Sequence, residues 1–136
     1  MKYSALMILF VVLLAGCSKD KRNARRLSGT WNLAELTVGD ITHMDDLGTF
    51  TFADKCKVKD GGCEGMITTA SGIEEPFEWT SVDNVLYITG TGSDGITDYT
   101  GKYTVTEHKK KRYVLTTTDA FILAGNDEAI LVLTKE

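Results

Sequence analysis

Apolar and polar residues alternate in twos along most of the chain after Thr30. A threonine separates Phe50 from Phe52, and a glutamate separates Phe77 from Trp79. Such alternation, with aromatic and β-branched residues, is typical of strands that are buried on one face. No segment shows the spacing of a convincing amphipathic helix. The pattern therefore predicts an all-β domain.

The alternation predicts eight strands, and the segments between them are rich in Gly, Asp, Asn and Ser. The predicted bounds are 30–38, 49–54, 63–69, 77–81, 85–90, 102–107, 112–118 and 129–135. Most connections are only a few residues long, so successive strands should be antiparallel neighbours. Eight strands in a meander can close into an up-and-down barrel without free edges, although the same strands also permit a flattened sandwich. Residues 120–124 either extend the seventh strand or form a short element of their own.

A different pattern begins the chain, where Lys2 precedes an apolar run over residues 5–15. The run is about half the roughly 20 residues that a membrane-spanning helix needs, and it is typical of a signal-peptide core. The sequence Leu-Ala-Gly-Cys that ends at Cys17 resembles the lipobox of bacterial lipoproteins. This resemblance implies cleavage of residues 1–16 and attachment of acyl chains, such as palmitate, to Cys17.

The lipoprotein resemblance also implies a location. Ser18 follows the cysteine, which by analogy with lipoprotein sorting in Gram-negative cells favours an anchor in the outer membrane, on its periplasmic face or at the cell surface. Several acyl chains hold a protein at a membrane far better than one. Residues 17–27 would then be a lipidated cysteine with a basic tether, and residues 28–136 are enough for one domain with a modest core.

Charge is segregated along the chain. Residues 18–27 hold five basic side chains against one acidic one, whereas residues 28–136 hold nine basic and eighteen acidic ones. The tether can meet anionic head groups or polysaccharide, or it can be a solvated linker. The basic run 109–112 can likewise meet anionic partners or protect a hairpin edge. A domain this acidic is a poor binder of nucleic acid.

Two further cysteines, Cys56 and Cys63, flank the turn-like sequence KVKDGG. In an exported protein this arrangement favours a disulfide across a hairpin, which would stabilise the fold by roughly 2.5 kcal/mol. A reduced thiol pair and a metal site are the alternatives, but nothing nearby has zinc-ligand spacing.

The motif LSGTWNL at residues 27–33 opens this eight-stranded pattern. Its Gly29 and Trp31 resemble the Gly-x-Trp signature of lipocalins and their calycin relatives, and the last predicted hairpin is similar to that of lipocalin-like bacterial lipoproteins. The resemblance implies that Trp31 plugs the closed end of a barrel and that a basic residue of the last strand, here Lys135, covers it. Thr97-Asp98-Tyr99 also spells a second lipocalin motif, but three predicted strands follow it where lipocalins have two.

Catalytic and metal-binding patterns are weak. His43 and His108 lie in no zinc-binding spacing, and no local motif suggests a catalytic triad. His43 with Asp45 and Asp46 is explained as well by a polar loop as by a metal site. We expect no enzymatic activity, no metal and no cofactor.

The predicted barrel interior is the remaining place for function. An eight-stranded barrel is just wide enough to be filled by side chains or to hold one small ligand. Aromatic residues whose alternation can point them inward, together with two residues of the long loop 39–47, are candidates for ligand contact: Phe52, Phe77, Trp79, Tyr87, Tyr103, His43 and Met44. The same aromatic residues would serve equally as a filled core.

Two functions follow. The first is a lipid-anchored envelope protein that binds a small hydrophobic molecule in its barrel. The alternative is a structural or interaction module with a filled barrel, which contacts a partner protein or a polysaccharide through its loops.

Overall fold

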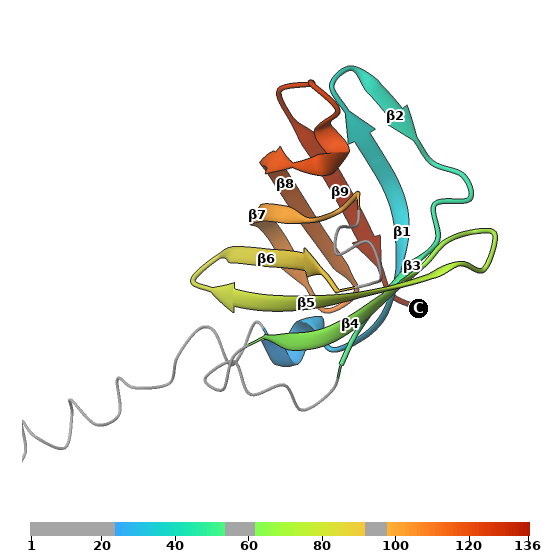
Figure 1. The fold of residues 1–136 in the computed structure, drawn as a ribbon. Helices are drawn as coiled ribbons and strands as arrows, with labels where there is room; N and C mark the ends of the chain where they lie inside the picture. Colours follow the sequence, from blue (N-terminus) through green and yellow to red (C-terminus); the bar gives the residue numbers. More distant parts are fainter. Residues whose placement is uncertain (1–23, 54–61, 92–97) are drawn as a thin grey trace, which may run out of the picture.

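The computed structural model describes residues 24–53, 62–91 and 98–136. Their strands form one antiparallel sheet in the order β2-β1-β3-β4-β5-β6-β7-β8-β9 (Figure 1). The strands are β1 (Gly29–Val38), β2 (Ile41–His43), β3 (Thr49–Phe52), β4 (Cys63–Thr68), β5 (Glu74–Val82), β6 (Val85–Gly90), β7 (Gly101–Lys109), β8 (Arg112–Ala120) and β9 (Ala129–Thr134).

The sheet closes on itself because β1 also pairs with β9, from Asn32 opposite Thr134 to Val38 opposite Ala129. On its other side, β1 pairs with β3 near its start and with the short β2 near its end. The eight longer strands therefore form a closed antiparallel barrel, and the prediction of an up-and-down barrel over a sandwich is confirmed. A closed barrel leaves these strands no free edge.

The structure adds one strand to the eight predicted. β2 lies in the segment that the sequence predicts to be a loop, and it forms a hairpin with the end of β1. Gly39 permits the tight turn between them, because its φ of 59° lies in the left-handed region that favours glycine. Three residues are too few to show a period-two pattern, so the sequence gives no signal for this strand.

For residues 120–124 the sequence left two alternatives, an extension of the strand before them or a short element of their own, and the structure contains part of each. β8 extends to Ala120, and a 3-10 helix, η2 (Phe121–Leu123), follows it. The helix ends at Ala124, which adopts a left-handed conformation with φ 46°. This short element forms part of the connection from β8 to β9.

The barrel has two different ends. At one end, which we call the closed end, lie the helical turn over residues 24–27, the tight β5–β6 turn and the β7–β8 hairpin. At the other, which we call the open end, lie the connections over residues 39–48, 69–73, 98–100 and 121–128. The strand registers fix this assignment, because every strand runs opposite to its neighbours.

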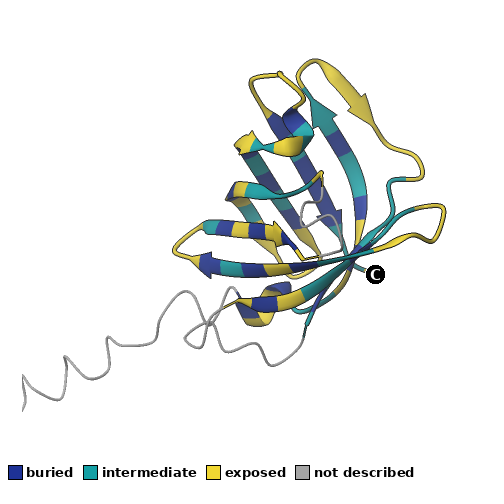
Figure 2. Cartoon of the chain, in the orientation of Figure 1, coloured by how far each residue is buried: buried dark blue, intermediate teal, exposed yellow. Residues whose placement is uncertain are grey.

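Burial alternates along the strands, as Figure 2 shows for β5 and β6. Leu86 and Ile88 of β6 are buried inside the barrel, whereas Tyr87 and Thr89 between them are exposed. The inward side chains form one apolar cluster that includes both tryptophans of the chain.

Candidate functional site

Trp31 lies at the closed end and is completely buried. Its indole Nε1 donates a hydrogen bond to the Leu27 carbonyl at 2.7 Å, and this contact ties the helical turn to the first strand. The Tyr113 ring packs against it edge to face, with 5.1 Å between ring centroids. These contacts pack Trp31, Leu27 and Tyr113 together at this end of the barrel, as expected for the predicted plug.

Lys135 lies over the same ring. Its Nζ is 5.0 Å from the Trp31 ring centroid and donates a hydrogen bond to the Ser28 carbonyl at 2.8 Å. A cation over an indole face is attracted by the negative face of the ring. The first and last strands of the barrel therefore meet through Trp31, Ser28 and Lys135.

Aromatic rings fill one side of the interior. Phe52 packs edge to face with Phe77 at 5.5 Å and with Trp79 at 5.3 Å between centroids. Phe50 lies next to both phenylalanines, at 6.2 Å from each. All four of these strand residues have only 1% of their surface exposed, so they form a dry wall inside the barrel.

Tyr99 lies over this wall from the open end. Its ring packs edge to face on Phe50 at 4.9 Å, and its backbone carbonyl accepts a hydrogen bond of 2.7 Å from the Tyr103 hydroxyl. Burial, with smaller effects from Asp98 and Glu75, raises the pKa of Tyr99 to about 12. The Tyr99 hydroxyl has no hydrogen-bond partner among residues 24–53, 62–91 and 98–136. It is a neutral polar group beside the aromatic side chains at the open end.

Tyr103 lies deeper and is fully buried. Burial is the main cause that raises the pKa of its hydroxyl, and Tyr99 adds to the effect. Because this hydroxyl already donates to the Tyr99 carbonyl, Tyr103 acts as a support for Tyr99. Phe52, Phe77, Trp79 and Tyr103 are thus brought together inside the barrel.

Tyr87 does not belong to this interior, and the prediction that it points inward is wrong. Its side chain is 40% exposed on the outer face of β6, opposite Leu86 and Ile88. The period of two is correct here, but the neighbouring aliphatic residues take the inner positions. An amphipathic tyrosine is stable on the outer face because its hydroxyl stays in water.

His43, the last residue of β2, and Met44 directly after it lie at the open end, and both are exposed. Met44 is 63% exposed, and three other large apolar side chains at this end are equally exposed: Ile41 at 64%, Ile73 at 60% and Phe121 at 60%. We call Ile41, Met44, Ile73 and Phe121 the apolar rim. Sequence reasoning missed three of its members, although an apolar residue within a polar turn, such as Ile73 after Gly72, is a usable signal.

Several predicted residues lie outside the described part of the chain. Cys17 and Cys56 are among them, so lipidation and the disulfide remain predictions. Cys63 is buried at the start of β4, opposite Trp79. Across the described ranges, no three His, Cys, Asp or Glu side chains are grouped to hold a metal ion. Nor does any described helix have the length and apolar character needed to cross a membrane.

Comparison with known proteins supports the same fold. A solved structure of a lipocalin-like protein from Bacteroides uniformis is similar to this chain, with a TM-score of 0.57 and 11% sequence identity. The match covers 82% of this chain and 99% of that protein. No protein-family model matches the sequence, and no curated protein matches it either.

The chain therefore has a lipocalin-like fold, and the resemblance drawn from Gly29 and Trp31 is confirmed at that level. A barrel of this class can serve as a binding module for a small molecule.

Proposed function

We propose that this chain is a lipid-anchored envelope protein that binds a small apolar molecule at the open end of its barrel. The observation that carries the proposal is the apolar rim, whose four side chains are 60–64% exposed at the open end of the barrel. Four of the six large apolar side chains that are exposed in the described part of the chain lie at this end, and exposed apolar surface concentrated in one place often marks a binding site.

The chemistry of the entrance fits such a ligand. Apolar surface contributes roughly 25 cal/mol per Å² when it leaves water, so a ligand between rim and interior gains affinity from burial. The Tyr99 hydroxyl can give one hydrogen bond that fixes its orientation. No covalent step is needed, and the anchor at Cys17 would keep the bound molecule at the membrane.

Native mass spectrometry is the first test. The chain from Ser18 onward, made in an exporting host, is measured under native and denaturing conditions. A native excess of a few hundred daltons that disappears on denaturation is the expected result, since drug-sized ligands fill sites of about 300–1,000 Å³.

Single substitutions locate the site. Phe121→Ser at the rim should weaken binding of an uncharged, environment-sensitive dye by about tenfold, because burying a Phe side chain is worth roughly 1.5–3 kcal/mol. Tyr87→Ser is the matched control, since this side chain is also exposed but lies on the outer wall. Ile73→Ser at the rim and Val82→Ser at the closed end form a second pair. Equal effects of rim and control variants would contradict the proposal.

The packed aromatic wall favours a second function, that of a filled module whose open end meets a partner protein. Phe50, Phe52, Phe77 and Trp79 already contact one another without a ligand. For this function, native and denatured masses should agree and the dye should not bind. Rim substitutions should then weaken only the association with another envelope protein.

A further inference from the structure

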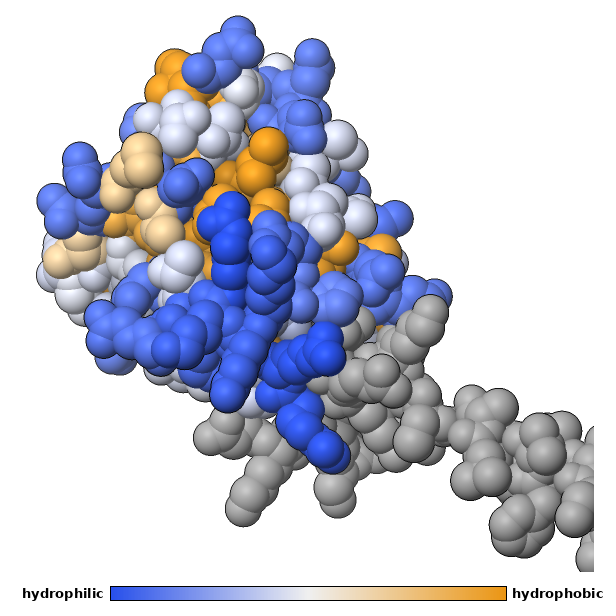
Figure 3. Space-filling view, turned by 180° about the vertical axis from the view of Figure 1, so that it is seen from behind, coloured by the Kyte–Doolittle hydropathy of each residue, from blue (hydrophilic) through white to orange (hydrophobic). Residues whose placement is uncertain are grey.

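The closed end carries a hollow of about 760 Å³ that basic side chains surround. It is formed by the helical turn, the β7–β8 hairpin and the last two residues of the chain. Its lining consists of Arg25, Arg26, His108, Lys109, Lys110, Lys111, Lys135 and Glu136. Figure 3 shows the most hydrophilic residues gathered on this face of the molecule. We call this feature the basic hollow.

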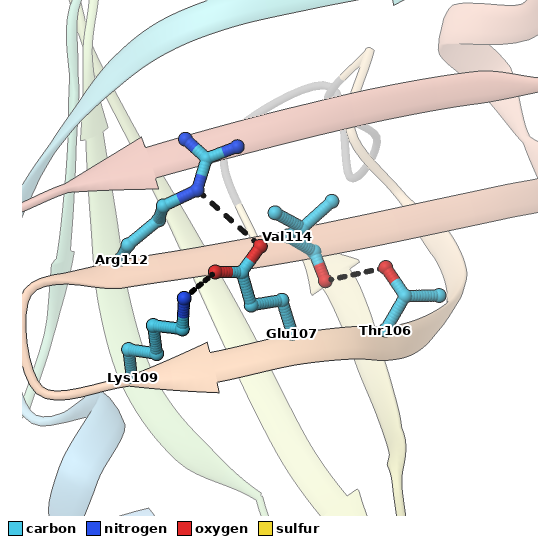
Figure 4. A network of polar contacts seen from close by, with 5 residues as sticks. All are labelled: Thr106, Glu107, Lys109, Arg112 and Val114. Atoms are coloured by element: carbon cyan, nitrogen blue, oxygen red, sulfur yellow. Dashed lines mark hydrogen bonds and ion pairs between the residues drawn. The ribbon is translucent and has the colours of Figure 1, made fainter.

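Carboxylates neutralise only part of this charge. Glu107 receives both Lys109, at 3.0 Å, and Arg112, at 3.3 Å, as Figure 4 shows. The hydrogen bond from Lys109 is the largest cause that lowers the pKa of Glu107. Within the described part of the chain, Arg25, Lys110 and Lys111 form no ion pair. The hollow therefore keeps unneutralised positive charge.

Two of its side chains are already held in place. The Lys135 ammonium is fixed by the Ser28 carbonyl and the Trp31 ring. A guanidinium nitrogen of Arg26 lies 2.9 Å from His108 Nδ1. Because arginine only donates, His108 Nδ1 accepts this bond, and Nε2 then carries the ring hydrogen as a further donor. Oriented donors and cations of this kind suit the oxygens of a phosphate group.

The opposite end has the opposite charge. The described connections at the open end contain six acidic residues and no Lys or Arg: Asp40, Asp45, Asp46, Asp98, Asp127 and Glu128. Of the Lys and Arg residues in residues 24–53, 62–91 and 98–136, all but Lys102 lie at the closed end. Among the described residues, positive side chains thus concentrate at the closed end, and the connections at the open end are acidic.

The chain enters the barrel at its basic end. Six residues separate Cys17 from Ala24, and the seven Cα–Cα steps between the two can span at most about 25 Å when fully extended. An acyl anchor at Cys17 would thus hold the basic hollow near the lipid surface. Charge attraction acts over roughly 8–10 Å at physiological salt, so this end is the one that a membrane can attract.

We infer that the basic hollow binds the phosphate head groups of anionic lipids, and that this contact turns the open end away from the membrane. The inference does not depend on ligand binding in the barrel. The closed end would then contact the membrane, and the apolar rim would face the aqueous space.

The test uses the chain from Ser18 onward, which lacks acyl chains but contains the whole domain, and vesicles of phosphatidylcholine with or without phosphatidylglycerol. Co-sedimentation should occur only with the anionic vesicles and should fall as salt is raised. Lys111→Gln should weaken binding about fivefold, and Lys110→Gln with Lys111→Gln about 25-fold. Lys102→Gln, which removes one exposed charge from the barrel wall, should change binding less than about twofold.

Other outcomes overturn the inference. Equal losses for Lys111→Gln and Lys102→Gln would mean that overall charge, and not the hollow, decides binding. If the protein with both substitutions bound the anionic vesicles as tightly as the unchanged protein, the tether and not the hollow would be the binding element. Saturable binding of inorganic phosphate without binding to anionic vesicles would identify a site for a free anion. Dye binding at the rim is a separate measurement, so failure here leaves the proposed function untouched.

Discussion

At the scale of single residues, Trp31 contacts three separate chain segments at the closed end. Its ring touches Tyr113 of β8 and Lys135 beyond β9, and its Nε1 holds the helical turn through Leu27. One side chain thus connects the beginning and the end of the domain. Its removal would leave a cavity together with an unpaired carbonyl.

Trp31→Ala should lower the free energy of unfolding by roughly 3–5 kcal/mol, as expected for truncation of a large core side chain. Urea denaturation followed by circular dichroism measures the change. Trp31→Phe, which keeps a ring but loses the hydrogen bond to Leu27, should cost less. A loss below about 1 kcal/mol for the alanine variant would contradict the role of Trp31 as a plug.

Tyr99 should make the stability of the domain decrease at alkaline pH. Its pKa is about 12 in the folded protein, against 10.0 for an ordinary tyrosine, mainly because of burial. The folded state thus disfavours the charged form, so the contribution of Tyr99 to stability is complete below pH 10 and is lost as the pH rises toward 12. Tyr99→Phe should make the unfolding free energy less dependent on pH in this window. An unchanged dependence would show that Tyr99 is ionised as easily as a free tyrosine.

At the scale of elements, β4 and β5 pack closely because β4 has a glycine, without a side chain, at the point where a ring of β5 lies against it. Gly65 lies opposite Phe77, and a Cβ at Gly65 would come within 2.2 Å of the Phe77 ring. The backbone of Gly65 has no positive φ, so the need for glycine here is one of space alone. The ring of one strand covers the bare backbone of the next.

Gly65→Ala should therefore destabilise the fold by about 1–3 kcal/mol, the usual cost of overpacking. The same substitution in a Phe77→Leu background should cost less, because the smaller side chain leaves room for the added methyl group. Thermal or urea unfolding of the four proteins gives this double-mutant cycle. Equal costs in both backgrounds would show that Phe77 is not the obstacle.

The alternation of apolar and polar residues predicted most strands, because a strand that is buried on one face must place apolar residues at every second position. β6 has the predicted bounds, and its turn before Val85 is marked by Asp83 and Asn84. β5 begins three residues earlier than predicted, since Glu74, Glu75 and Pro76 resemble a turn but pair with β4. Backbone pairing with a neighbour decided this boundary, and a single sequence does not contain that information.

The candidate site was predictable only in part, for a similar reason. Alternation shows that two faces differ, but it does not say which one is inside when both carry apolar residues. In β6 the choice lay between Leu86 with Ile88 and Tyr87, and the structure buries the aliphatic pair. The apolar rim could not be predicted from sequence either, because only the strand registers show that the connections with Ile41, Ile73 and Phe121 lie at the same end of the barrel.

At the scale of the whole molecule, the two ends of the barrel differ in charge and in apolar exposure. The sequence shows a basic tether and an acidic domain, but the fold gathers the basic residues of that domain beside the tether. Antiparallel pairing is the cause, since the β7–β8 hairpin, the start of β1 and the end of β9 all reach the same end. Both proposals depend on this separation of the two ends.

The pairing of β1 with β9 also sets an order of events in the life of the chain. The strand made first needs the strand made last as its neighbour, and Trp31 needs Lys135. A ribosome that has not yet released the end of the chain therefore holds a barrel that cannot be finished. Until then, one side of β1 offers unpaired backbone groups to any other strand. Closure of the barrel is therefore a step that follows the synthesis of β9, whatever the earlier strands have already formed.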